Sequence, residues 1–395
     1  MKKNELVLMM ALITIILFLS MLLSGCTSNQ RYDIENLYFS ADGTKLVSMN
    51  NGQRYHDTKL LKSGSDIQVW DTYSGNEVWK KFYDAFFSQI YLSNDGHYLT
   101  VDSSIYNISS NKLIKNISGI FQDWSIDGKL FLTRNGSKTL NVFNIDDYSL
   151  NKTIEINETI LSSYEMKISP DNLKILFVPE GKKSIGIIDI NSNKTIILQN
   201  CSIQINETLY GDNNKIYWSN NGKKVGLIYS REHYISGRFI KEHYIIIWDS
   251  IGGLKLNEIF LNDTGIKTPI ISSDFEKYGY LFVPYIYPEK YKDGGYWGKD
   301  KTVFKIFNLS DNSQILEIGT GEFIYSYYPS YDWSYNTGKI AIGTEGGSIY
   351  LFNSSNGKII KKIDTPIHTI NIPGFELVLV LIAIVLVLFW KRKRI

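Results

Sequence analysis

The stretch DWSIDGKLFLT, residues 123–133, recurs in altered form as DWSYNTGKIAIG at residues 332–343. Each copy places an aromatic or aliphatic residue before Ser, then Asp or Asn, then usually Gly and an apolar run. Seven copies occur, with serines at Ser40, Ser93, Ser125, Ser169, Ser219, Ser272 and Ser334. Their mean spacing of about 49 residues predicts a repeat architecture built from similar units.

Each repeat continues in the same way. The apolar run after the turn reads as one strand, and a second apolar strand then ends in Asp or Asn, at Asp71, Asn107, Asn144, Asp189, Asp249, Asn308 and Asn353. Gly and Asn tolerate positive φ, and a short carboxylate or amide bonds its own backbone where a strand ends. A more polar strand follows, so each unit is expected to hold four short strands, here called a to d.

A lone four-stranded sheet cannot bury both faces, whereas seven sheets arranged radially cover one another. The sequence therefore predicts an all-β fold, a seven-bladed β-propeller of four-stranded antiparallel blades at residues 36–364. An unrelated array of β-sandwiches is the alternative. The blades are expected at residues 36–82, 88–117, 119–154, 165–198, 214–260, 268–318 and 327–363.

Two resemblances support this fold. The sequences VWD at 69–71 and IWD at 247–249 resemble the WD-repeat propellers, over roughly residues 32–364. The family's Gly-His pair is missing, so its hydrogen-bonded tetrad is not expected. Residues 69–82, VWDTYSGNEVWKKF, also resemble a repeat of quinoprotein-type propellers, which implies that Trp79 docks between blades. Such an enzyme would need an acidic metal cluster and a quinone stack. Neither is recognisable, so no cofactor and no metal are expected.

The N-terminus has the pattern of a secretory signal: Lys2 and Lys3, an apolar run at 6–23, and small residues before Cys26. The order Leu-Ser-Gly-Cys resembles a lipoprotein lipobox, which implies that residues 1–25 are removed and that Cys26 is lipidated. Residues 26–35 would then be a short linker. The alternative is a retained N-terminal signal helix.

The C-terminal segment, residues 365–395, contains an uncharged apolar run at 377–390 followed by four cations. Together with Pro373, Gly374 and Phe375 it resembles the PGF-type sorting signal of archaeal surface proteins. That resemblance implies processing by an archaeosortase and transfer to a lipid. A plain C-terminal transmembrane helix is the alternative. The basic flanks of both ends predict cytoplasmic termini, and hence a body at the extracellular face of the membrane.

Composition and sequons fit this location. Lys and Arg number 42 against 40 Asp and Glu, and the terminal cations leave the body slightly acidic, so no nucleic-acid partner is expected. Candidate N-glycosylation sites are Asn107, Asn116, Asn135, Asn151, Asn157, Asn193, Asn200, Asn206, Asn262, Asn308 and Asn353.

Long b–c connections at residues 50–65, 230–243 and 284–302 belong to blades 1, 5 and 6. In WD-type propellers these connections share one face, and loops on a rigid scaffold commonly carry binding. Exposed aromatic residues suit sugar rings or protein patches. The candidate ligand rim is Tyr55, His56, Tyr234, Tyr285, Tyr287, Tyr291, Tyr296 and Trp297. The alternative is that these rings only pack against the blades.

The blade 5 insertion reads as a hairpin that turns at residues 236–237. This register pairs Glu232 with Lys241 and Arg231 with Glu242, so opposite charges face each other. His233 and His243 then point to opposite faces, which makes them poor joint metal ligands.

The sequence contains no Gly-x-Ser-x-Gly elbow, phosphate loop or paired-cysteine metal spacing. We therefore expect a non-catalytic, membrane-anchored extracellular module that binds a protein or a glycan. One alternative is a glycan hydrolase or lyase with its site at the mouth of the central channel. Another is an envelope scaffold resembling the propeller lipoproteins that help to insert membrane proteins.

Overall fold

The computed structural model describes residues 34–365, apart from 57–58, 86, 88–89, 161–165, 180–184, 199–214, 236–237, 263–264, 284, 287–295, 298–302, 320–329, 335 and 345–346. All of its strands lie within the compact unit Tyr32–Asp364. The expected signal helix and C-terminal helix fall outside the described residues.

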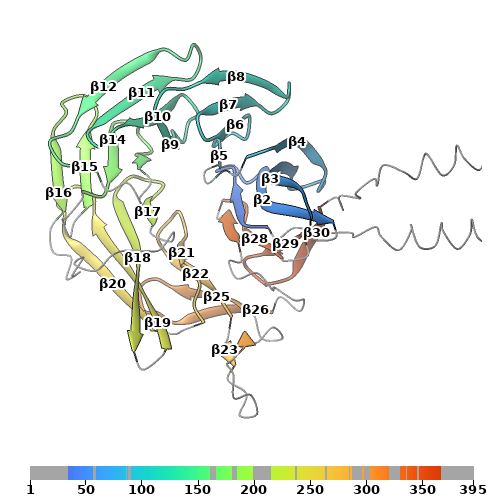
Figure 1. The fold of residues 1–395 in the computed structure, drawn as a ribbon. Coiled ribbons are helices and arrows are strands. Elements are labelled where there is room, and N and C mark those ends of the chain that lie inside the picture. The colour runs from blue at the N-terminus through green and yellow to red at the C-terminus, as the bar shows by residue number, and fades with distance from the viewer. Residues whose placement is uncertain are drawn as a thin grey trace, which may run out of the picture. The chain divides into compact units, whose positions relative to one another are not determined.

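Seven four-stranded antiparallel sheets, here blades 1 to 7, follow one another around a ring (Figure 1). Blades 1 to 3 contain β1 (Asn36–Phe39), β2 (Lys45–His56), β3 (Lys59–Asp71), β4 (Glu77–Tyr83); β5 (Ile90–Leu92), β6 (Tyr98–Val101), β7 (Ser104–Asn107), β8 (Lys112–Asn116); and β9 (Ile120–Trp124), β10 (Leu130–Asn135), β11 (Thr139–Asn144), β12 (Leu150–Glu155).

Blades 4 to 7 contain β13 (Lys167–Ile168), β14 (Lys174–Phe177), β15 (Ile185–Asp189), β16 (Thr195–Leu198); β17 (Lys215–Trp218), β18 (Lys224–Ile235), β19 (Arg238–Asp249), β20 (Lys255–Asn262); β21 (Ile270–Ile271), β22 (Lys277–Phe282), β25 (Val303–Asn308), β26 (Gln314–Gly319); and β27 (Tyr331–Ser334), β28 (Lys339–Gly343), β29 (Ser348–Asn353), β30 (Ile359–Asp364). A small hairpin, β23 (Tyr285–Ile286) and β24 (Tyr296–Trp297), lies between β22 and β25. The predicted number of sheets and their strand order are confirmed.

The hydrophobic core is divided into seven clusters, one between each pair of neighbouring blades. Between blades 4 and 5, for example, Leu176 and Ile187 of one sheet pack with Leu227 and Trp248 of the next. Each sheet thus buries its two faces against two different neighbours. This arrangement explains why one blade cannot fold alone and why a ring can.

The repeated Ser-x-Asp phrase forms the a–b turn. In six blades the buried Ser hydroxyl donates to the Asp or Asn two residues later and accepts the first N–H of strand b. In blade 3, Ser125 Oγ lies 2.8 Å from Asp127 Oδ1 and 2.8 Å from the Leu130 nitrogen. The repeated carboxylates are therefore turn formers, as the sequence predicted.

The c–d turn of blade 1 yields a prediction about pH. The Ser74 N–H and the Lys45 ammonium, 2.9 Å from Asp71, hold the pKa of Asp71 well below its usual range despite the opposing effect of burial. The stability that this carboxylate contributes is therefore present above pH 3.8 and is lost as the pH falls further. Asp71→Asn keeps the turn acceptor, as Asn107 does naturally, and removes only the ion pair.

We expect Asp71→Asn to lower the free energy of unfolding by up to about 1 kcal/mol at pH 7. Urea unfolding at pH 7 and near pH 3 measures the difference from wild type, which should shrink in acid. A difference of equal size at both pH values would contradict this assignment.

The ring closes without exchanging a strand, because every four-stranded sheet comes from one continuous stretch of chain. Blades 7 and 1 are joined by side chains and core packing instead. The Phe39 N–H donates to Asp332 Oδ2 at 2.7 Å, and Ser330 Oγ donates to the Ile34 carbonyl at 2.8 Å. Asn336 Nδ2 donates to the Ala41 carbonyl at 3.0 Å.

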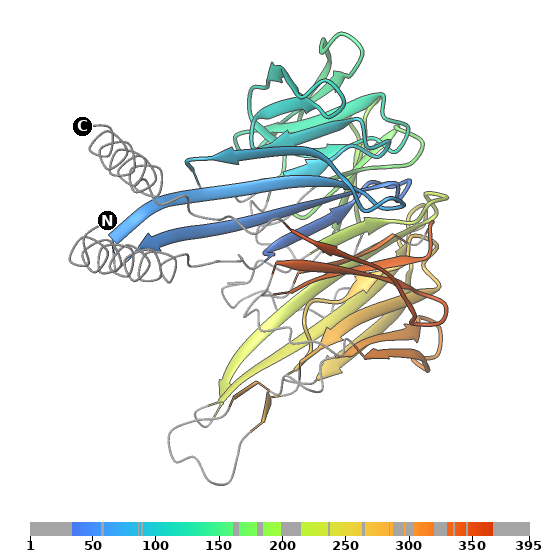
Figure 2. The same cartoon turned by 90° about the vertical axis from the view of Figure 1, so that its right-hand side faces the viewer.

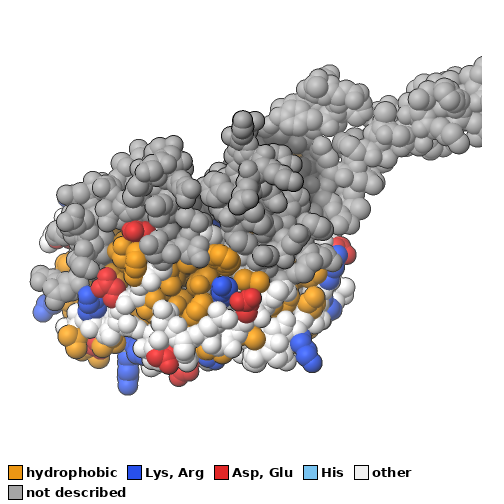
Figure 3. Space-filling model, turned by 90° about the horizontal axis from the view of Figure 1, so that it is seen from below, with side chains coloured by type: hydrophobic (Ala, Val, Ile, Leu, Met, Phe, Trp, Pro, Cys, Tyr) orange, Lys and Arg blue, Asp and Glu red, His pale blue; other side chains and the backbone are white. Residues whose placement is uncertain are grey.

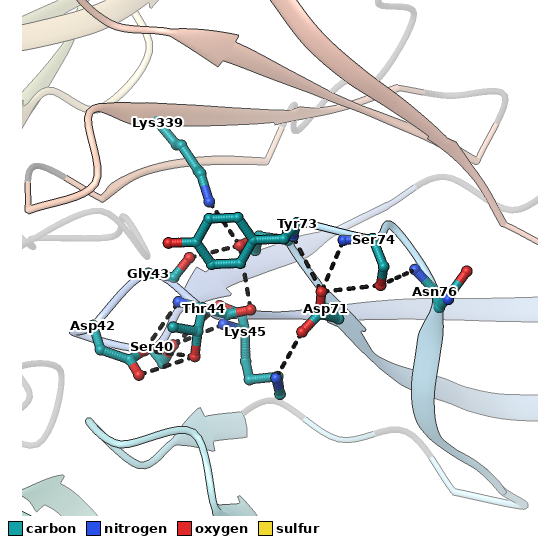
Figure 4. Close-up of polar contacts among 11 residues, drawn as sticks. Ser40, Asp42, Gly43, Thr44, Lys45, Asp71, Tyr73, Ser74, Asn76 and Lys339 are labelled. Atoms are coloured by element: carbon teal, nitrogen blue, oxygen red, sulfur yellow. Dashed lines mark hydrogen bonds and ion pairs between the residues drawn. The ribbon is translucent and has the colours of Figure 1, made fainter.

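A buried lysine crosses the same junction. Lys339 of β28 donates to Thr72 Oγ1 at 2.9 Å, and its ammonium lies 3.8 Å from the centroid of the Tyr73 ring (Figure 4). Lys339 is only 7% exposed, and burial lowers its pKa although Asp71 and Asp42 oppose the shift. The junction therefore rests on a few directional polar contacts as well as on apolar packing.

Candidate functional site

Three b–c hairpins project from the same side of the ring (Figure 2). Blade 1 extends β2 and β3, blade 5 extends β18 and β19, and blade 6 inserts β23 and β24. The short a–b and c–d turns lie on the opposite side (Figure 2). Because blades 5, 6, 7 and 1 are consecutive around the ring, the extended hairpins gather on one sector of a single face, called here the hairpin face.

The structure places the backbone of most residues of the expected rim on these hairpins. Tyr55 pairs with Leu60 near the tip of blade 1, and Tyr234 pairs with Phe239 in blade 5. Tyr285 lies opposite Trp297 in the blade 6 hairpin. His56, next to Tyr55, pairs with Lys59 in blade 1. Tyr296, next to Trp297, pairs with Ile286 in blade 6. Tyr287 and Tyr291 lie outside the described residues.

The expected register of the blade 5 hairpin is confirmed. Glu232 pairs with Lys241, Arg231 with Glu242, and His233 with Ile240. The predicted turn, residues 236–237, lies outside the described residues. The pairing register determines which residues share a face of this hairpin, because side chains alternate between the two faces of a strand.

His243 has a structural role that the sequence did not reveal. It is fully buried, with Nδ1 2.7 Å from Ser230 Oγ and Nε2 3.1 Å from the Ile266 carbonyl. Both ring nitrogens are therefore engaged, and the imidazole ties the base of the hairpin to the segment that leads into blade 6. The Ser that the register places opposite His243 was the available signal.

The two DWS phrases perform the same task at two blade junctions. Asp123 Oδ2 accepts the N–H of Ile168 at 2.8 Å, which links β9 of blade 3 to β13 of blade 4. Asp332 Oδ2 accepts the N–H of Phe39, which links β27 of blade 7 to β1 of blade 1. In both cases a carboxylate from one innermost strand satisfies the backbone of the next.

One ion pair joins the innermost strands of blades 3 and 4. Lys167 lies 3.2 Å from Asp123 Oδ1. Burial raises the pKa of Asp332, although Lys215, the Phe39 N–H and Lys167 oppose the shift. Part of the Asp332 surface stays accessible. Desolvation by the surrounding inner strands still dominates this pKa. Both inner-strand carboxylates accept a backbone N–H from the neighbouring blade.

No protein-family model matches the chain, and no curated protein matches it in sequence. The solved structure titled "KlHsv2 with loop 6CD replaced by a Gly-Ser linker" aligns with a TM-score of 0.50 and 10% identity. The alignment covers 85% of this chain and 100% of the other. The chain is a seven-bladed β-propeller. At this identity the likeness concerns the fold alone.

Within the propeller, Trp79 lies between blades as the quinoprotein-type resemblance implied. It is 3% exposed, and its ring lies 5.8 Å from that of Tyr106 in blade 2. The two Trp residues of the WD-like phrases differ. Trp70 donates through Nε1 to Ser48 Oγ at 2.9 Å, whereas Trp248 Nε1 has no hydrogen-bond partner among the described residues.

Expected glycosylation sites divide by exposure. The exposed ones are Asn116, Asn135, Asn151, Asn157 and Asn193, and the half-buried ones are Asn107, Asn308 and Asn353. The half-buried group ends strand c and takes part in the c–d turns. Asn200, Asn206 and the side chain of Asn262 lie outside the described part. Exposure thus separates the predicted acceptors whose side chains reach the surface from those that the c–d turns engage.

Within the described ranges, no group of three or more His, Cys, Asp or Glu residues is placed to hold a metal ion. The same ranges contain no helix with the length and apolar character of a membrane span. Cys26, Pro373, Gly374 and Phe375 lie outside the described residues.

Proposed function

We propose that this propeller is a non-catalytic binding or scaffolding module, anchored to the membrane at the extracellular face and presenting its hairpin face to a protein or a glycan. The observation that carries the proposal is the clustering of three extended hairpins on one face. The rigid ring fixes their bases, and aromatic residues lie on the strands that project from it. Such a surface suits recognition of a large, flat partner.

The hairpin face can be tested with paired variants. We expect Trp297→Ser combined with Tyr234→Ser to weaken binding to a printed oligosaccharide array, or to a protein photo-crosslinked at the hairpins, by at least about tenfold. Ile126→Ser is the matched control, because Ile126 is 42% exposed on an a–b turn of the opposite face. Equal binding by both variants would refute the assignment of this face.

The anchoring proposal rests on the signals at the two ends of the sequence. Mass spectrometry of the mature protein should show a lipid on Cys26 and loss of residues 1–25. Processing near Pro373, Gly374 and Phe375 would support the sorting signal, and an intact C-terminus would support the plain anchor. An enzyme remains the alternative function, and turnover of array oligosaccharides would favour it.

A further inference from the structure

An aromatic stack crosses three strands of blade 5. Tyr229 of β18 pairs with Tyr244 of β19, which pairs in turn with Phe260 of β20. The first two rings are 4.6 Å apart at 7°, and the next two are 4.9 Å apart at 38°. Exposure increases along the stack, from 6% at Tyr229 to 48% at Phe260. The stack therefore ends at an exposed ring on the outermost strand.

The ring spacing of this stack equals the spacing of hydrogen-bonded strands, about 4.7–4.9 Å. Strand β20 is the last strand of its sheet, so its outer edge is unpaired within that sheet (Figure 1). The next position in the stack would thus belong to a strand paired with this edge. An aromatic residue placed there opposite Phe260 would continue the stack at the same interval.

Strand β20 differs from the other outer strands in length. It has eight residues, whereas the outer strands of the other blades have four to seven. Leu256 on β20 is 48% exposed, and Leu254 just before it is 68% exposed. Hydrophobic side chains gather on the side of the molecule seen in Figure 3. The charged pair Lys255 and Glu258 is joined at 2.6 Å, which leaves little net charge along the strand.

We propose that the outer edge of β20 binds an extended peptide segment of a partner protein by β-strand addition. The segment carries an aromatic residue opposite Phe260 and uncharged residues at alternate positions. Edge backbone groups provide affinity, and alternate side chains provide specificity. This perimeter site is separate from the hairpin face and does not depend on the function proposed for it.

A second copy of this chain fits the same edge less well. Stacking Phe260 on Phe260 of an antiparallel copy would overlap only residues 258–262 of β20. Leu254 and Leu256 would then stay uncovered. A peptide strand can instead extend along β20 past Glu258, whose N–H is already held by Asn257 Oδ1, and cover both Leu256 and Phe260.

The test is selection of a random octapeptide display library on the full-length protein. The selected peptides should alternate in polarity and carry a central aromatic residue. Phe260→Lys should reduce their affinity by more than tenfold, because a charge on an edge strand opposes strand pairing. Phe260→Thr, which keeps strand propensity and removes the ring, should reduce it several-fold.

Ile359→Lys is the matched control, since Ile359 is 57% exposed on the outer strand of blade 7, and it should leave affinity unchanged. Methylation of alternate peptide nitrogens should abolish binding. Selection of no aromatic peptide, or equal affinity for Phe260→Lys with unchanged thermal unfolding, would overturn the proposal. Sedimentation that shows a wild-type dimer abolished by Phe260→Lys would assign the edge to a second copy instead.

Discussion

Replacing Trp248 by alanine is expected to lower the free energy of unfolding by about 3–5 kcal/mol, the range for large aromatic truncations in a core. Trp248 is fully buried and packs in the cluster between blades 4 and 5, with Leu227 and Ile246 of its own sheet and Leu176 of the neighbouring one. Truncation leaves a cavity at a junction that both sheets need. Urea unfolding of the purified protein, monitored by far-UV circular dichroism instead of tryptophan fluorescence, measures this loss of free energy.

Trp248→Phe separates packing from hydrogen bonding. Because Trp248 Nε1 has no partner in the described part of the chain, phenylalanine should cost less than about 1.5 kcal/mol. Trp70→Phe should cost about 1 kcal/mol more than that, since it removes the hydrogen bond to Ser48. Equal losses for the two phenylalanine variants would contradict this distinction.

The second large effect concerns ring closure. We expect Asp332→Ala to lower the free energy of unfolding by about 1–3 kcal/mol, because the Phe39 N–H loses its acceptor. Asp332→Asn keeps an acceptor oxygen and removes a charge that burial disfavours. At pH 7 its free energy of unfolding should therefore equal that of wild type or exceed it by up to about 1 kcal/mol.

The pH dependence of Asp332→Asn has a definite sign. Because the pKa of Asp332 is raised in the folded protein, the folded state binds its proton more tightly than the unfolded state does. Stability from this group is therefore full below pH 3.8 and is lost as the pH rises through the raised pKa. Wild type should lose stability relative to Asp332→Asn as the pH rises, by urea unfolding in steps from pH 3 upward.

Asp123→Asn is the matched control in the other DWS phrase. Asp123 lies 3.2 Å from the Lys167 ammonium, and the substitution removes this ion pair, so the variant should lose about 1 kcal/mol at pH 7. The same substitution in the same phrase thus has opposite expected effects. A difference between wild type and Asp332→Asn that does not change with pH would contradict the account.

The ring was predictable because its signals are local. A Ser-x-Asp turn depends on residues within five positions, as Ser125, Asp127 and Leu130 show, so it can be recognised without any knowledge of the neighbouring blades. The blade 5 register was equally accessible, because opposite charges mark which residues face each other. Periodicity then fixed the number of sheets.

What the sequence did not reveal lies between blades. Asp123 and Asp332 bond backbone groups of residues 45 and 293 positions away, and no local pattern announces such a partner. The buried polar residues of blade 1 were missed for the same reason. Ser48 and Gln68 are each 1% exposed on β2 and β3. Each lies two residues from Leu46 or Trp70, on the face that packs against blade 7.

The aromatic stack shows an intermediate case. Tyr229, Tyr244 and Phe260 are visible in the sequence, but only the pairing of three strands brings their rings into one row. The expected rim on the hairpin face depends on side chains that no periodic pattern orients. The residue types of this rim could be predicted from the sequence, whereas the orientation of its side chains could not.

Closure without a shared strand has a topological consequence. Each blade is one uninterrupted piece of chain, so the order of blades around the axis is independent of where the polypeptide starts. Joining the ends of residues 34–364 with a linker and opening the chain between two other blades would leave every sheet whole. The ring could therefore be circularly permuted at an inter-blade connection, with all seven sheets and all seven junctions retained.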